Sequence, residues 1–222
     1  HGILAKLLAV MQFTLKGTPF VFQGDEMGLA NYEFTSMEQI TDVEAKGYYE
    51  EHIRTQPEKE VFAAILAGTR EHTRVLLPWN KTLPSWHKGL FQKPRKDVLA
   101  AYRKLIALRH QEKALVYGTF RLISRKKNRF VYKRTLGGTV CLIDCNLGEK
   151  PCRAYLSHLA HAASGEKWEL IYSTADKARS MDTASQTDKV GNADTDTTES
   201  AGAGMFLHGY EARIWKQKRT RK

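Results

Sequence analysis

A short apolar segment near the start of the chain limits the folds that this sequence can adopt. Residues 20–22 read Phe-Val-Phe with no polar alternation, and Gly17 marks a turn before them. Such a run predicts a strand that is covered on both faces, as in a parallel sheet. Residues 23–26 read Gln-Gly-Asp-Glu, and α/β folds place ligands at the carboxyl ends of such strands. Asp25 and Glu26 therefore belong either to an active-site rim or to a hydrogen-bonded acidic turn.

The segments around this strand have helical periodicity. Apolar residues recur at helical spacing over residues 3–15, and the same pattern predicts helices over 57–68 and 97–112. Asp97 is the expected N-cap of the last one. A helix that precedes a buried strand is the repeating unit of an α/β barrel or a doubly wound sheet. Residues 29–56, which lie between the predicted strand and the helix over 57–68, are predicted to be a long irregular loop.

From Thr119 onward the apolar period changes to two, which predicts short antiparallel strands and an all-β module, most simply a small sandwich. Gly137 and Gly138 are expected to form a hairpin turn, and Tyr155 is expected in a strand. Residues 174–204 are rich in Ser, Thr, Asp, Ala and Gly. A segment of this composition can bury little surface and is predicted to be a mobile loop or a weak hairpin.

The chain carries a formal net charge of +11, which raises the possibility of a nucleic-acid or polyanion partner. Much of the excess is local, in residues 93–104, 121–134 and the tail 216–222, which is expected to be solvated. No zinc-ligand spacing, helix-turn-helix pattern or RNA-binding aromatic motif accompanies it. We therefore expect solvated basic faces and no nucleic-acid partner, with a basic binding module as the alternative.

The three cysteines, Cys141, Cys145 and Cys152, are odd in number and predict free thiols in a reducing compartment. Cys141 and Cys145 share one face of a predicted strand, where core packing is expected. No apolar run approaches the length of a membrane span. We expect a cytoplasmic protein without a membrane partner, a metal site or a cofactor.

Several of these segments resemble glycoside hydrolase family 13, the α-amylase family. Residues 17–28, Gly-Thr-Pro-Phe-Val-Phe-Gln-Gly-Asp-Glu-Met-Gly, look like the eighth barrel strand of its oligo-1,6-glucosidase, α-glucosidase and trehalose-6-phosphate hydrolase branch. Phe22 replaces the usual Tyr, and Asp25 replaces the first Glu. Residues 102–109 and 114–118 resemble the last barrel helix and its exit.

This resemblance implies a fold of two parts. Residues 1–116 would be the carboxyl-terminal part of a (β/α)8 TIM barrel, with strand eight and its helices. Residues 117–222 would be an antiparallel β-sandwich domain, with the low-complexity insertion near 174–204.

The resemblance also marks two substrate-binding candidates. The family reads Asp-Ile-Glu or Asp-Val-Glu followed by Tyr, which matches Asp42-Val43-Glu44 with Tyr48 or Tyr49 and implies that Glu44 lies at the substrate rim. Arg70, Arg74 and Trp79 keep the spacing of a second family block, whose first arginine binds sugar hydroxyls. The alternatives are structural: Thr41 or Asp42 caps a short helix whose first-turn carboxylate is Glu44, and Arg70 holds a loop through backbone carbonyls.

The family's catalytic carboxylates have no counterpart in this chain. The nucleophile follows a Gly-Phe-Arg-x-Asp pattern and a third carboxylate ends an Asn-His-Asp, and neither occurs in the 222 residues. The resemblance thus implies that the chain is part of a retaining hydrolase of α-glucoside oligosaccharides. It implies no catalytic residue in this chain, and it implies that an upstream barrel segment of the same protein is its partner. A noncatalytic carbohydrate-binding scaffold is the remaining alternative.

Overall fold

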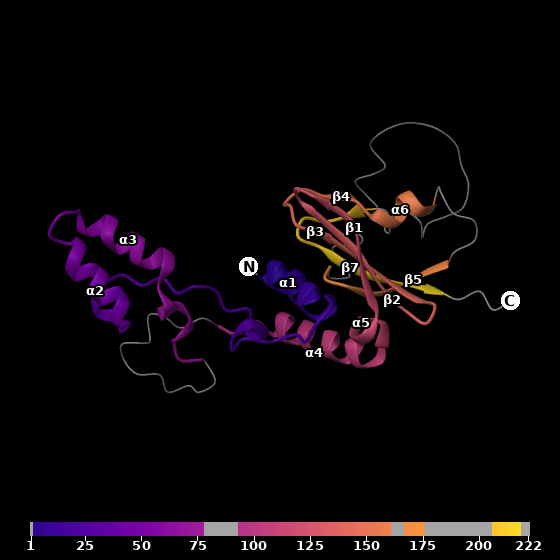
Figure 1. Cartoon of the computed structure of the whole chain (residues 1–222), viewed down its shortest axis with the longest axis horizontal. Helices are drawn as coiled ribbons and strands as arrows, with labels where there is room; N and C mark the ends of the chain where they lie inside the picture. The colour runs from indigo at the N-terminus through magenta and orange to yellow at the C-terminus, as the bar shows by residue number, and fades with distance from the viewer. Residues whose placement is uncertain (1, 78–92, 161–166, 176–205, 219–222) are drawn as a thin grey trace. The chain divides into compact units, whose positions relative to one another are not determined.

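The computed structural model describes residues 2–77, 93–160, 167–175 and 206–218 (Figure 1). The chain forms two compact units, one of residues 1–21 with 97–222 and one of residues 22–96. This division differs from the boundary expected after residue 116, which stays a prediction. Trp79 and nearly all of the segment 174–204 lie outside the described residues.

The first unit is built on an antiparallel sheet. Its five strands are ordered β1-β2-β3-β7-β5, and β4 pairs with β6 in a second, two-stranded sheet. The strands are β1 (Thr119–Lys126), β2 (Arg129–Leu136), β3 (Thr139–Asn146), β4 (Cys152–Arg153), β5 (Lys167–Ser173), β6 (Phe206–Leu207) and β7 (Ala212–Lys218). Gly137 and Gly138 join β2 to β3 with φ of 52° and 83°, the left-handed pair that a tight hairpin turn requires. The antiparallel strands predicted around residues 120–142, 168–172 and 212–215 and the hairpin are confirmed.

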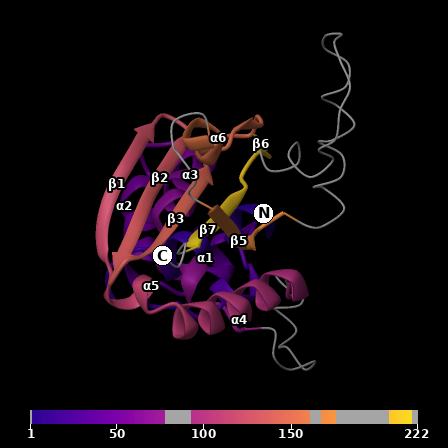
Figure 2. The same cartoon turned by 90° about the vertical axis from the view of Figure 1, so that its right-hand side faces the viewer.

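Helices cover one face of this sheet (Figure 2). They are α1 (Gly2–Thr14), α4 (Lys96–Gln111) and α5 (Lys113–Tyr117). Leu7 and Val10 of α1 pack with Leu105 of α4 on Ile143 and Ile214 of the sheet, all at most 1% exposed. The predicted helices are confirmed, and this helical layer is why the segments before and after residue 116 form one unit.

A sandwich of two large sheets is not seen in the described residues, because the second sheet has only two residues in each strand. Tyr155 was expected in a strand but begins helix α6 (Tyr155–Ala160). Its backbone N–H donates to Asp144 Oδ2 at 2.7 Å, which favours a helix start over a strand. Asp97 lies inside the first turn of α4 and pairs with Lys6, so its assignment as the N-cap is wrong. The tail is solvated less than expected, since Lys216 lies in β7 and its Nζ is 2.6 Å from Glu112 Oε1.

The predicted buried strand at residues 20–22 is wrong for this chain. Residues 18–22 have no regular secondary structure, and Phe20 is 84% exposed. A strand needs a neighbour for its backbone N–H and C=O groups. All strands of the described residues begin after residue 118, and none of them pairs with this segment.

The second unit holds two helices that lie side by side, α2 (Val43–His52) and α3 (Glu58–Gly68) (Figure 1). Its core contains Ile40, Val61 and Ile65. Three short 3-10 helices complete it: η1 (Asp25–Met27), η2 (Met37–Gln39) and η3 (Arg70–Thr73). The loop predicted over 29–56 is therefore partly helical, and Asp42 holds the expected N-cap position of α2. No helix in the described ranges is long and apolar enough to cross a membrane.

The cysteine predictions are confirmed in part. All three thiols are free, and Cys141 and Cys145 are buried in the core under the helices. Burial raises the pKa of Cys141 to about 11 and also raises the pKa of Cys145, so both stay neutral and act as small apolar side chains.

Two arginines bind the helix ends, Arg134 from the sheet and Arg109 from α4. Arg134 of β2 is completely buried and donates to four backbone carbonyls at 2.6–3.4 Å. These carbonyls belong to Thr14, Leu115, Val116 and Gly118. Arg109 of α4 donates to the carbonyls of Phe13, Leu115 and Gly17 at 2.6–2.8 Å. The acceptors lie at the carboxyl ends of α1 and α5, where helices leave carbonyls without partners and carry partial negative charge.

We expect Arg134→Met to lower the free energy of unfolding by about 3 kcal/mol or more, because four carbonyls lose a charged donor in a buried site. Urea unfolding followed by circular dichroism measures it. Arg125→Met, which removes an exposed arginine from β1, is the matched control and should change little. Equal stabilities of the two variants would contradict this account of Arg134.

Candidate functional site

The structure brings the two substrate-binding candidates together. Arg70 Nη2 lies 2.9 Å from Glu44 Oε2 and 3.2 Å from Asp42 Oδ1. Glu44 is 79% exposed at its side chain, whereas the carboxylate of Asp42 is 5% exposed. Asp42 therefore anchors the arginine from below, and Glu44 contacts it from the solvent side. Whether Arg70 and Glu44 bind sugar stays a prediction.

Asp42 receives a second guanidinium. Arg74 Nη1 donates to the same Oδ1 atom at 2.9 Å. This explains why Asp42 holds the N-cap position of α2 without a side-chain cap hydrogen bond, since its carboxylate is turned to the two arginines. The alternative in which Arg70 holds a loop has support here, but through a carboxylate rather than through backbone carbonyls.

A buried glutamate fixes the two chain segments to each other. Glu71 Oε1 accepts from Thr41 Oγ1 at 2.7 Å, and Oε2 accepts from the backbone N–H of Asp42 at 2.9 Å. Thr69 Oγ1 in turn accepts from the Glu71 backbone N–H at 3.2 Å, which caps η3. The start of α2 is thus held against η3 by the charge-assisted bonds of Glu71, in addition to those that Asp42 makes with the two arginines. Sequence reasoning missed Glu71, whose only signal was an acidic residue inside the Arg70–Arg74 block.

A cavity of about 260 Å³ lies beside this cluster. Asp42 and Glu44 line it, together with Tyr48, Ile65 and Thr69 among others. Of the two tyrosines that matched the family pattern, Tyr48 faces the cavity, while Tyr49 donates to Glu58 at 2.8 Å. The cavity thus offers two carboxylates, a phenol and an apolar wall, which are groups that contact sugars.

The acidic turn after residue 22 satisfies its own backbone. Asp25 Oδ2 accepts from the N–H of Phe22 at 3.1 Å, and Glu26 Oε2 accepts from the N–H of Gly24 at 3.0 Å. Gly24 and Gly28, both with positive φ, bracket this turn. The geometry favours the hydrogen-bonded turn for both carboxylates. In the described parts of the chain, no group of three or more His, Cys, Asp or Glu side chains could hold a metal ion.

The chain is similar to known carbohydrate enzymes. It is 34% identical over 162 residues to an oligo-1,6-glucosidase of Halalkalibacterium halodurans, a match that covers 64% of this chain and 29% of that protein. An oligo-1,6-glucosidase of Parageobacillus thermoglucosidasius is 31% identical over 168 residues, covering 66% of this chain and 30% of that protein. The chain thus spans less than a third of the length of these relatives.

The chain is also similar to solved structures of carbohydrate enzymes, and again it covers only part of each of them. Isomaltulose synthase from Klebsiella sp. LX3 superposes with a TM-score of 0.69 at 25% identity, over 97% of this chain and 38% of that one. Trehalose-6-phosphate hydrolase of Bacillus licheniformis gives a TM-score of 0.72 at 21% identity, over 98% of this chain and 39% of that one, and so supports the fold alone.

A family model also matches the chain. The model described as "Alpha amylase, catalytic domain" matches residues 2–118, more than half of the chain. These residues hold α1, both candidate side chains and the helices that pack on the sheet. The chain belongs to the alpha-amylase family.

Proposed function

We propose that this chain is the carboxyl-terminal part of a retaining glycoside hydrolase that cleaves α-glucosidic bonds in short oligosaccharides. The observation that carries the proposal is the contact of Arg70 with Glu44 at 2.9 Å beside a cavity, in a chain of the alpha-amylase family. Relatives named oligo-1,6-glucosidase support this substrate class. The three free cysteines support a reducing, cytoplasmic location for the complete enzyme.

In this proposal Arg70 binds hydroxyl groups of the sugar, and Glu44 stands at the rim. The Arg70 side chain is 52% exposed, and both of its contacts use Nη2. Its Nε and Nη1 donors have no partner among the described residues, so the planar fork can donate to neighbouring hydroxyls. The buried carboxylate of Asp42 would hold the guanidinium in a fixed orientation, which lowers the entropic cost of binding.

The chemistry itself would reside in other residues of a longer protein. Retaining glycosidases need two carboxyl groups about 5–5.5 Å apart, one as nucleophile and one as acid/base. The family pattern of the nucleophile and that of the third carboxylate do not occur in the printed sequence. The exposed apolar side chains of residues 20–22 support a barrel partner, since neighbouring strands would cover them and supply their missing backbone bonds.

The proposal predicts that the 222-residue chain alone does not hydrolyse an aryl α-glucoside, because it lacks the nucleophile and the acid/base. The assay follows release of the phenol against a no-enzyme blank. Sugar binding without turnover would favour the noncatalytic scaffold if the complete gene product is also inactive. Turnover that copurifies with the chain through two different purification steps would overturn the assignment of the catalytic groups.

We expect Arg70→Ala in the complete enzyme to lower kcat/KM by about tenfold to a few hundredfold, because a charged donor to a sugar hydroxyl contributes about 1.5–3 kcal/mol. Arg70→Lys should restore only part of the loss, since an ammonium lacks the planar fork. Arg74→Ala is the matched control, because Arg74 contacts the same Asp42 oxygen but makes no ion pair with Glu44 in the described structure. The assignment of Arg70 fails if Arg74→Ala lowers kcat/KM equally, or if the loss follows the melting temperature alone.

A further inference from the structure

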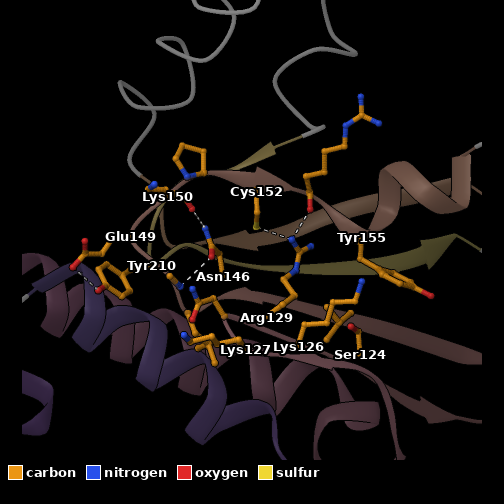
Figure 3. Close-up of a pocket in the computed structure, with 16 residues that line it drawn as sticks. Ser124, Lys126, Lys127, Arg129, Asn146, Glu149, Lys150, Cys152, Tyr155 and Tyr210 are labelled. Carbon is orange, nitrogen blue, oxygen red and sulfur yellow. Dashed lines mark hydrogen bonds between the residues drawn. The ribbon is translucent and has the colours of Figure 1, made fainter.

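A second cavity lies in the unit that contains the sheet. Its volume is about 850 Å³ and it is lined by residues of the β1–β2 turn, the turn after β3, and β4 (Figure 3). This volume is within the range of small-molecule sites, about 300–1,000 Å³. The site already described does not use any of these residues.

The lining is strongly cationic. Five basic side chains line this cavity, against one carboxylate, Glu149. The basic residues are Lys126, Lys127, Arg129, Lys150 and Arg153. Figure 3 shows the Arg129 guanidinium near the middle of the lining, with Lys126 and Lys127 on one side and Lys150 across from them. The cavity therefore concentrates positive potential, which attracts anions.

Most of this charge is not neutralised by the protein. Arg129 Nη2 lies 2.6 Å from the fully buried carboxylate of Asp144, so the charge of Arg129 is neutralised by this ion pair. Arg129 therefore contributes to the wall of the cavity rather than to its net charge. Lys126, Lys127, Lys150 and Arg153 have no carboxylate partner among the described residues. Arg153 Cζ lies 5.9 Å from the centroid of the Phe206 ring, so the uncompensated cations of the lining are the three lysines.

The cavity is held in shape by its own backbone contacts. Asn146 is 2% exposed and donates from Nδ2 to the carbonyls of Lys150 and His208 at 2.8 and 2.7 Å, while its Oδ1 accepts from Gly148 N at 3.1 Å. Gly209 lies so close to the turn that an added Cβ would be 1.9 Å from the carbonyl oxygen of Glu149. A preformed wall of this kind lowers the cost of ordering a ligand.

We propose that this cavity binds a small molecule that carries a phosphate group. Lysine ammonium groups act as point charges for phosphate oxygens, and Tyr155 and Tyr210 add aromatic surface to the lining for the remainder of the ligand. A hollow lined by several chain segments suits a compact ligand better than a polymer, which would need a continuous charged track. This site is independent of the proposed glycosidase activity, because it lies on other residues and its test needs no turnover.

Isothermal titration calorimetry of the complete chain with glucose 6-phosphate, inorganic pyrophosphate and glucose tests the proposal. We expect both phosphate compounds to bind, glucose not to bind, and affinity to fall as salt rises. The paired change Lys126→Gln with Lys150→Gln should weaken binding of the phosphate compounds by at least about tenfold, the loss of charge-assisted bonds. Comparing glucose 6-phosphate with pyrophosphate shows whether the sugar adds to recognition.

The control removes the same charge elsewhere. Lys104→Gln with Lys113→Gln changes two exposed lysines that do not line the cavity and should keep the affinity of the original chain. The proposal is overturned if both paired variants weaken binding equally, or if neither phosphate compound binds at millimolar concentration. A single-stranded oligonucleotide that binds more tightly than either compound, and equally to both variants, would also contradict it and indicate a general polyanion surface.

Discussion

The first unit depends on a buried cation at the place where two helices end. Arg134 is completely buried, and its desolvation, together with the nearby charge of Arg109, lowers its pKa. A buried charge is costly unless it is well hydrogen-bonded. The four carbonyls at the ends of α1 and α5 meet this need, and they are themselves groups that a helix leaves unsatisfied. The carbonyls satisfy the hydrogen-bond donors of the buried guanidinium, and the guanidinium supplies the donors that the helix ends lack. These bonds hold α1 on the sheet.

The sequence predicted those elements whose stabilising contacts are local or lie within one layer. Helix α1 and the β2–β3 hairpin follow from apolar period and turn glycines, and both are confirmed. The strand at residues 20–22 failed because its pattern describes burial by neighbours that the described residues do not contain. The prediction that Tyr155 lies in a strand was wrong, because the alternation of apolar residues in a short segment does not show that the Tyr155 backbone N–H donates to Asp144.

The candidate site was predictable only in its exposed residues. Glu44 and Arg70 were found through a resemblance, which carries spacing along the chain but no contacts. The organising role of Asp42 depends on two arginines that are 28 and 32 positions away, and no local pattern encodes that separation. For the basic cavity, the sequence showed part of the charge but not where the charged side chains gather. Lys126 and Lys127 belong to the basic segment 121–134, which was expected to be solvated, but only the fold shows that they line one hollow together with Lys150.

Hydrogen–deuterium exchange of the complete chain tests most directly whether the arginine-fastened helix belongs to the same cooperative unit as the sheet. The account predicts that the amides of α1 exchange as slowly as those of β2 and β3, because Arg134 and Arg109 hold its carboxyl end. It also predicts fast exchange at the amides of Phe20 and Val21, which lie outside any helix or strand. Fast exchange throughout α1 beside a slowly exchanging sheet would contradict the central claim.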